Sequence, residues 1–374
     1  MNQEIYAATL MFALMPGTVF GQGVDMRLQD GAFAPVLAHF EASASEPWAP
    51  QMQAMVDVHM GRQDRVLRRL RDLPFAALDC DAGESGATHV AAADWLLAIA
   101  SDRRVVMLNE NHFHVAARLF LFESLPALRE AGFTHLALEA FEPDSTFLEP
   151  GSGGYTREPI FAAVIRRATA LGFELVAYEF AGESIESREA GQADHLQRAI
   201  EHAGEDARFI VFAGWSHILE RPDTFGRRWM AARFRDESGI DPFTVDLTSC
   251  MHKSASPRDA RVALDPDGAA LVHGQQYAGG VDAQIQLPIP LELAPGFYRQ
   301  ALGSPTPVEL PEVLDEPVLV RAWSENAESV PVPVDQIFVL PGEEAVLYLP
   351  PGSYELTVND GDGATLSRKM VSVP

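Results

Sequence analysis

The sequence predicts an α/β protein whose central domain, residues 101–255, is an open, doubly wound and mostly parallel sheet. Two observations carry this prediction. Short apolar runs alternate with longer segments of helical periodicity, a pattern typical of parallel strands covered by helices on both faces. The runs are too few for an eight-stranded barrel, so an open sheet is expected. They are Val105–Leu108, His135–Leu138, Glu174–Tyr178, Arg208–Ala213 and Phe243–Leu247.

Helical segments separate these runs, and each of the first two ends before a glycine. Gly132 and Gly172 stand where a left-handed residue commonly terminates a helix. Helices are therefore expected at His112–Ala131, Pro159–Leu171, Ser187–His202 and Phe225–Asp236.

Residues 1–21 have the outline of a signal peptide. Ile5–Phe20 is apolar, and cleavage is expected before Gln22. Glu4 departs from the usual pattern, since no positive charge precedes the apolar stretch. The apolar stretch and the expected cleavage point still favour export to the periplasm. The alternative is a cytoplasmic protein whose N-terminus forms a buried helix.

Residues 22–100 are expected to form a helical N-terminal segment. Apolar residues recur at close to helical spacing over Gln51–Leu73, and Pro74 stops that helix. A second helix is expected over His89–Ala100. The arginines of the first helix are expected on a solvated face. They are Arg62, Arg65, Arg68, Arg69 and Arg71.

After the central domain the chain changes to turn-rich β-structure. Residues 256–311 are rich in Pro, Gly and Asp and are expected to be an irregular connecting region with short strands. Residues 312–374 alternate apolar and polar positions between strong turn signals, which predicts a small β-sandwich domain. Its expected strands are Val318–Trp323, Gln336–Leu340, Ala345–Leu349, Tyr354–Val358 and Leu366–Val373.

Charge and cysteine content argue against several classes of protein. The formal net charge of −25 argues against binding to nucleic acid or to an anionic membrane surface, because both need clustered basic residues. No later apolar stretch reaches ~18 residues, so the mature chain is expected to lack a transmembrane span. Cys80 and Cys250 match no zinc motif or disulfide framework. Two unrelated buried thiols are expected, with one long-range disulfide as the alternative.

Ionisable residues follow the predicted strands at the points where the strands end. The carboxyl ends of parallel strands converge on one crevice, where ligands bind. Carboxylates crowded there repel each other, so a metal ion, an arginine such as Arg188 or a protonated histidine must balance them. The residues at these strand ends are Glu110, His112, Glu139, Glu179 and His217.

Some of these residues have a simpler structural explanation. A strand-end glutamate can cap the N-terminus of the next helix, which explains one such residue more readily than several beside two histidines. His114 lies two residues after His112 and on a helix would face elsewhere, so it is expected to be structural.

Five short motifs follow one another through the central domain. They are NENH at 109–112, ALEAF at 137–141, AYEF at 177–180, SREAGQADHL at 187–196 and GWSH at 214–217. In this order they resemble the haem-binding-uptake/Tiki clan, which includes ChaN-like, TraB-like and erythromycin-esterase-like proteins. The clan's usual first motif is Gly-Glu-x-His, and Asn109 stands in place of that glycine.

The resemblance implies an α/β fold with a central site and a helix beside it. Members of the clan include metal-dependent proteases, a metal-independent macrolide esterase and haem- or iron-binding proteins. The resemblance therefore indicates the fold more specifically than it indicates the reaction. The site residues that it implies are Glu110, His112, Glu139 and His217, with Arg188 and Glu189 on the helix.

The leading hypothesis is hydrolysis of an ester or amide bond in a small molecule or peptide. Glu110 or His112 would deprotonate the attacking water. Arg188 or His217 would stabilise the oxyanion or protonate the leaving group. A serine nucleophile is disfavoured because no Gly-x-Ser-x-Gly motif occurs. If a divalent metal assists, its expected ligands are Glu110, His112, Glu139 and His217.

The substrate pocket has its own set of expected residues. For the two aromatic members, packing is the alternative role. The set is Tyr155, Glu179, Glu189 and Trp215.

Two further hypotheses stay open. The protein would bind haem or iron without catalysis if His112, His217 or Tyr178 served as a ligand. Alternatively, the strand-end residues would form a structural ion-pair network in an inactive scaffold, with the C-terminal β-domain making the functional contacts.

Overall fold

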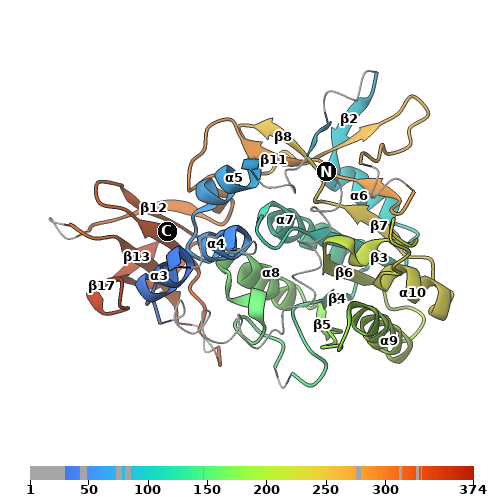
Figure 1. Cartoon of the computed structure of the whole chain (residues 1–374), viewed down its shortest axis with the longest axis horizontal. Coiled ribbons are helices and arrows are strands. Elements are labelled where there is room, and N and C mark those ends of the chain that lie inside the picture. The colour runs from blue at the N-terminus through green and yellow to red at the C-terminus, as the bar shows by residue number, and fades with distance from the viewer. Residues whose placement is uncertain are drawn as a thin grey trace.

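The computed structural model is a mixed α/β structure with one large parallel sheet and several smaller sheets (Figure 1). It describes residues 30–42, 49–72, 78–80, 86–145, 147–274, 279–310, 314–325, 328–329 and 331–374. The signal-peptide outline at residues 1–21 lies outside the described residues. Within the described residues, no helix is both long and apolar enough to span a membrane.

The central sheet has six strands, all parallel, in the order β10-β7-β3-β6-β4-β5. Each strand predicted for the central domain is present. An additional strand, β10, comes from the region expected to be irregular and pairs with β7 at the edge of the sheet. The strands are β3 (Val105–Glu110), β4 (His135–Leu138), β5 (Glu174–Ala177), β6 (Phe209–Gly214), β7 (Phe243–Asp246) and β10 (Ala283–Gln284).

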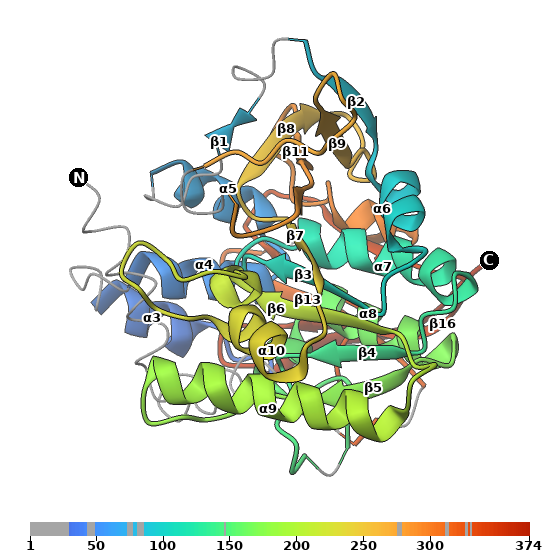
Figure 2. The same ribbon diagram turned by 90° about the vertical axis from the view of Figure 1, so that its right-hand side faces the viewer.

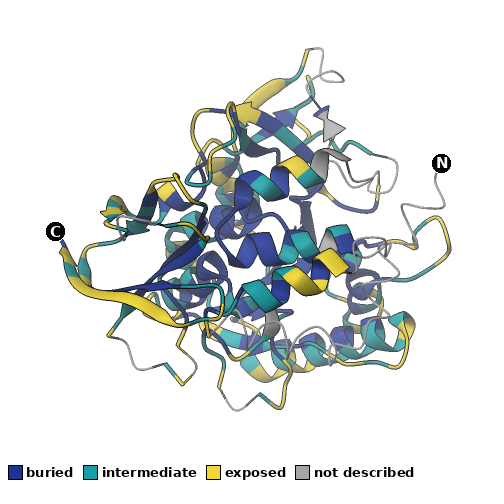
Figure 3. Cartoon of the chain, turned by 60° about the vertical axis from the view of Figure 1, so that its left-hand side comes forward, coloured by how far each residue is buried: buried dark blue, intermediate teal, exposed yellow. Residues whose placement is uncertain are grey.

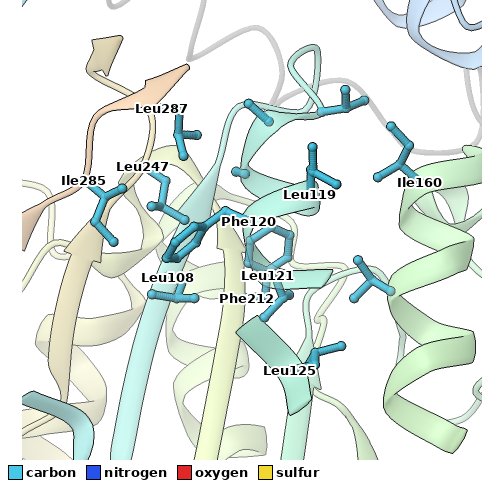
Figure 4. Packing of buried hydrophobic residues seen from close by; sticks show 14 of the residues in the cluster. Leu108, Leu119, Phe120, Leu121, Leu125, Ile160, Phe212, Leu247, Ile285 and Leu287 are labelled. Carbon is cyan, nitrogen blue, oxygen red and sulfur yellow. The ribbon is translucent and has the colours of Figure 1, made fainter. Parts of the chain in front are cut away.

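Helices cover both faces of this sheet (Figure 2), because its strands are apolar on both sides. In β3, Leu108 packs into the cluster under α6, α7 and α8, and Met107 packs into the cluster under α9 and α10. Figure 4 shows Leu108 and Phe212 of the sheet beside Leu121 of α7. The helices are α6 (Ala92–Ala100), α7 (Ala116–Glu130), α8 (Pro159–Ala170), α9 (Ile185–Ala203) and α10 (Met230–Ser238).

The predicted helix over Gln51–Leu73 is wrong in one respect, because the chain forms two helices there. They are α4 (Ala49–His59) and α5 (Gln63–Asp72). Between them Gly61 adopts a φ of +71°, and a Cβ at this position would lie 2.2 Å from the carbonyl oxygen of Gln336. The helical period continues across the break, so periodicity alone does not reveal it.

The predicted helix over His89–Ala100 begins later than expected, at Ala92. Residues before it form β2 (Thr88–Ala91), which pairs antiparallel with β9 (Arg261–Leu264). Hydrogen bonds to a strand that is distant in the sequence decide this boundary.

The prediction of a solvated arginine face is wrong for Arg62, which directly precedes α5. Its side chain is 4% exposed and pairs with Asp64 at 2.9 Å and with Glu343 at 2.7 Å. Arg69 pairs with Asp57 of α4 at 2.8 Å. These arginines join α4 and α5 to each other and to the C-terminal strands.

The C-terminal strands form a four-stranded antiparallel sheet, β14-β13-β16-β17, and an antiparallel pair, β12-β15. Both contribute to one apolar cluster. β17 is exposed along most of its length (Figure 3). The strands are β12 (Ser304–Val308), β13 (Val318–Ser324), β14 (Asp335–Val339), β15 (Ala345–Leu349), β16 (Gly352–Asn359) and β17 (Thr365–Val373).

Helix α4 connects the C-terminal strands to the central domain. Its Val56 packs with α3 (Ala34–Ala42) and with Phe338 of β14. Its Ala54 and Val58 belong instead to the cluster that fills one face of the central sheet. Helix α4 therefore lies between the central sheet and the C-terminal strands.

Cys80 and Cys250 form a disulfide, with Cα atoms 5.8 Å apart, so the expectation of two unrelated thiols is wrong. Cys80 directly follows β1 (Leu78–Asp79), and Cys250 begins β8 (Cys250–Ser254). β1 and β8 pair in parallel, and β11 (Leu287–Pro290) pairs with the other edge of β8. This pairing joins cysteines that are 170 residues apart, which no local pattern indicates.

Replacing both cysteines by serine is expected to lower the free energy of unfolding by about 2–4 kcal/mol, because the bond closes a long loop in the unfolded chain. Urea unfolding measures the loss, and reductant added to the native protein should reproduce it. Alkylation of the denatured, unreduced protein should label no thiol. Labelling of both cysteines would contradict the pairing.

Candidate functional site

The carboxyl ends of four neighbouring strands, β3, β6, β4 and β5, bring the predicted site residues together. Glu110 is the last residue of β3, and Glu139 directly follows β4. His217 lies in the short 3-10 helix η3 (Trp215–Ile218) after β6, and Arg188 lies in the first turns of α9. Because α7 begins at Ala116 rather than at the predicted His112, His112 sits in the loop after β3.

Glu110 is buried and paired on both oxygens. Its Oε1 accepts a hydrogen bond from Nδ1 of His112 at 2.8 Å. Arg118 donates to Oε2 from Nε at 2.6 Å and to Oε1 from Nη2 at 3.0 Å. Burial raises the pKa of Glu110, but Arg118 and His112 outweigh that effect and hold the pKa below its usual value. Glu110 is therefore an ionised acceptor that orients His112.

The contact with Glu110 also assigns the tautomer of His112. A carboxylate only accepts hydrogen bonds, so the hydrogen lies on Nδ1, and the lone pair of a neutral ring is then on Nε2. This nitrogen faces Gly214, where a Cβ would lie 2.5 Å from it and 3.2 Å from Oε2 of Glu139. The missing side chain of Gly214 is what allows these two groups to approach the same point.

Glu139 is the centre of a second group of charges. Its Oε1 accepts from Nη2 of Arg188 at 2.6 Å and lies 3.3 Å from Nε2 of His217. Its Oε2 accepts from the backbone N–H of Gly214. Burial raises the pKa of Glu139, but His217 and Arg188 outweigh it and hold the pKa well below its usual value.

His217 lies between two buried carboxylates. Its Nδ1 is 2.8 Å from Oε2 of Glu189, and its Nε2 faces Glu139. Burial lowers the pKa of His217, but Glu139 and Glu189 raise it to about 10. With both ring nitrogens protonated, Nη1 of Arg188, 3.2 Å from Nε2, is a neighbouring cation and not a donor to the ring.

Arg188 joins this group to Glu179. Its Nε donates to Oε1 of Glu179 at 3.0 Å, and its Nη2 donates to Oε2 at 2.5 Å. The side chains of Arg188 and Glu179 are 21% and 18% exposed, whereas that of Glu139 is 5% exposed. Arg188 and Glu179 are therefore the charged groups of the site that solvent reaches most easily.

Two aromatic side chains enclose His112. The ring of Tyr155 stacks on it with centroids 4.2 Å apart, and that of Trp215 lies edge-on at 4.9 Å. Burial and the nearby carboxylate of Glu139 raise the pKa of Tyr155, so its phenol is neutral. Both pocket aromatics thus contact the predicted base directly.

Tyr178, considered as a haem or iron ligand, and His114, expected to be structural, make their contacts outside the candidate site. The hydroxyl of Tyr178 is buried and donates to the carbonyl oxygen of Phe212 at 3.1 Å. Nε2 of His114 lies 2.9 Å from the hydroxyl of Tyr298. Both side chains are bound to structural partners.

Arg118 is the site residue that sequence reasoning missed. It lies in α7 with its guanidinium between the carboxylates of Glu110 and Glu158, 3.2 Å from the latter. One signal was present: Arg118 is the only charged residue in the apolar stretch Ala116–Phe122. A single arginine in such a stretch indicates a buried partner.

A divalent metal ion would need the donor atoms of Glu110, His112, Glu139 and His217 to be directed at one point. Among the described residues, no group of three or more His, Cys, Asp or Glu side chains is arranged to hold a metal ion. Glu110 is bound by Arg118, and Glu139 is bound by Arg188. The residues as arranged do not fit a divalent metal, and we assign no step to one.

No family model and no curated protein matches the chain. Solved structures that resemble it include RRSP, a MARTX toxin effector domain from Vibrio vulnificus, at 13% identity over 62% of this chain and 44% of that chain, with a TM-score of 0.34. The type III effector HopBA1 matches at 13% identity over 55% of this chain and 97% of that chain, with a TM-score of 0.33. The chain thus spans less than half the length of the first of these. Similarities of this size carry no argument about function.

Replacing Arg118 by methionine is expected to lower the free energy of unfolding by about 3–5 kcal/mol, because Glu110 would stay buried without its cation. Urea denaturation measures this loss. Arg198→Met is the control, since Arg198 is 71% exposed in its pair with Asp194 and its loss should change the stability by at most about 1 kcal/mol. Similar small losses in both variants would contradict the importance of the buried pair.

The raised pKa of His217 predicts a pH-dependent contribution to stability. The folded chain binds the proton more tightly than the unfolded chain, whose pKa is near 6.5. The stabilisation is fully present below that pH and is lost as the pH rises through about 10. The stability gap between the native protein and His217→Gln should therefore be largest in mild acid, on the order of a few kcal/mol, and shrink in alkali.

Urea unfolding at several pH values measures this gap. His202→Gln is the control, since His202 lies exposed near the end of α9. A gap that widens with rising pH would contradict the protonated state of His217.

Proposed function

We propose that the protein hydrolyses an ester or amide bond and that it does so without a metal ion. The observation that carries the proposal is the Glu110–His112 hydrogen bond of 2.8 Å, which orients Nε2 of His112 towards the second group of charges. An imidazole held in this way by a carboxylate is a general base for water.

His112, and not Glu110, is the base in this proposal. Glu110 shares its charge with Arg118 through two hydrogen bonds, which lowers its pKa and makes it a weak base. Water bound at Nε2 would give its proton to His112 while its oxygen attacks the carbonyl carbon. When the tetrahedral intermediate collapses, the bond to the leaving group breaks and His112 returns the proton to that group.

The cations of the second group have the complementary role. Negative charge develops on the carbonyl oxygen as water attacks, and a positioned cation stabilises it. Arg188 is partly exposed and keeps a raised pKa, because Glu139 and Glu179 outweigh the effect of burial. Arg188, supported by protonated His217, is the group that we assign to the oxyanion, with Tyr155, Glu179 and Trp215 lining the pocket. Glu189, also expected in the pocket, is buried against Nδ1 of His217 and holds that ring instead.

The proposal extends to fold type, relationship and location. We propose that the central sheet is an open doubly wound sheet, that the C-terminal strands form a β-sandwich, and that the chain is related to the haem-binding-uptake/Tiki clan. We also propose export to an oxidising compartment such as the periplasm, because the Cys80–Cys250 disulfide would persist there. The substrate would be a small molecule or a peptide.

His112→Ala is expected to lower kcat on a panel of esters and amides by about 10²–10⁴-fold, because it removes the base. Glu110→Gln should also lower kcat, because the amide orients the imidazole less firmly. His202→Ala is the control and should keep full activity. Steady-state kinetics measures kcat and KM, and urea unfolding checks that each variant is folded.

Unchanged turnover in His112→Ala and Glu110→Gln would contradict the proposal. A native protein without turnover whose variants lose several degrees of Tm would instead favour a structural ion-pair network. A Soret shift on titration with haemin would favour a haem-binding protein.

A further inference from the structure

We infer that Asn109 is a positioning residue for the candidate site: its amide holds the turn at Trp215, and this turn sets the places of both site histidines. The part of the inference that concerns rate rests on the proposed function. The part that concerns geometry rests on the hydrogen bonds alone.

The side chain of Asn109 bonds to the ends of both strands that flank β3. It is fully buried, and its Nδ2 donates to the carbonyl oxygen of Trp215 at 2.8 Å and to Oδ1 of Asp246 at 2.9 Å. Its Oδ1 accepts from the backbone N–H of Leu247 at 2.6 Å. Since β6 ends just before Trp215 and β7 ends at Asp246, one amide ties together the carboxyl ends of three adjacent strands.

Trp215 is the residue that needs this support. Its φ of +28° lies in the left-handed region, and no other non-glycine residue among those described has a positive φ. A residue with a side chain keeps such a conformation only where surrounding contacts stabilise it. The hydrogen bond from Asn109 is one of these contacts, and it fixes the peptide plane that follows Trp215.

The turn places both histidines. The ring of Trp215 lies edge-on to His112 at an interplanar angle of 74°, and Tyr155 stacks on the same imidazole. His217 follows Trp215 by two residues in η3. A change in the turn would therefore move the base and the cation cluster relative to each other, and a small misplacement of this kind costs rate.

A buried amide can also serve stability alone, and Gln284 is the matched control for that role. It is buried in β10, and its Nε2 donates to Oδ2 of Asp246 at 2.7 Å. Its Oε1 accepts from the backbone N–H of His273 at 2.9 Å. Among the described residues, its hydrogen bonds do not include Trp215.

The first measurement is the ¹H–¹³C NMR signal of the His112 imidazole, which responds to the rings of Tyr155 and Trp215. We expect Asn109→Ala to shift this signal and Gln284→Ala to leave it in place, at a temperature where both variants are folded. An unmoved signal in Asn109→Ala would overturn the inference, whether or not the protein is a hydrolase. If Asn109→Ala does not fold, Asn109→Ser replaces it with the same expectations.

The second measurement is a double-mutant cycle with Trp215→Gly, which accepts a positive φ without strain but removes the ring. We expect Asn109→Ala to lower kcat by about 10–100-fold with little change in KM. Added to Trp215→Gly, it should lower kcat no further, because its effect passes through the turn. Additive losses would overturn the inference.

A shifted His112 signal in a protein that hydrolyses nothing on the panel would support the positioning geometry and count against the proposed function.

Discussion

The buried carboxylates at one edge of the central sheet must share very few positive charges, and the arrangement of the site follows from this constraint. Arg118, which lies in α7, forms an ion pair with Glu110. Arg188 lies between two carboxylates, and so does His217. Each cation serves more than one partner, so removing any one leaves a buried charge whose desolvation is no longer offset. The buried carboxylates are Glu110, Glu139 and Glu189, and the partly exposed Glu179 shares Arg188 with Glu139.

The same use of arginine recurs where elements of this acidic chain meet. Arg62 joins the start of α5 to Glu343 near the C-terminal strands. Arg299, in the short helix η4 (Arg299–Ala301), pairs at 2.5 Å with Asp335 at the start of β14. Both arginines are buried, and planar guanidinium groups suit such two-sided contacts. In a chain of net charge −25, many basic side chains are thus internal connectors, and a basic run in the sequence does not indicate a basic surface.

The sequence predicted the strands of the central domain well because each is a short apolar run, a local property. Once the strands are known, the meeting of Glu110, Glu139 and Glu179 follows from parallel topology alone. The break at Gly61, the strand β10 and the pairing of the cysteines depend on partners far away in the sequence, so no local pattern reveals them.

Arg118 was missed for a related reason. Which side of α7 faces Glu110 depends on where that helix begins, and the boundary of a helix is its least predictable feature. The expected metal site has the same origin. Glutamates and histidines at the carboxyl ends of neighbouring strands suggest a metal site as long as the arginines that bind the carboxylate oxygens are not known.

His112 and His217, the two histidines of the candidate site, differ in the carboxylates that they contact. His217 is held between Glu139 and Glu189, and these two outweigh the effect of burial and keep it a cation. Nδ1 of His112 is hydrogen-bonded to Glu110, and that carboxylate is also bound by Arg118. Arg118 holds the Glu110 carboxylate in place with two hydrogen bonds, and the hydrogen bond from Nδ1 to that carboxylate orients the ring of His112. Arg118, in the first turn of α7, thus orients the base of the proposed reaction through Glu110.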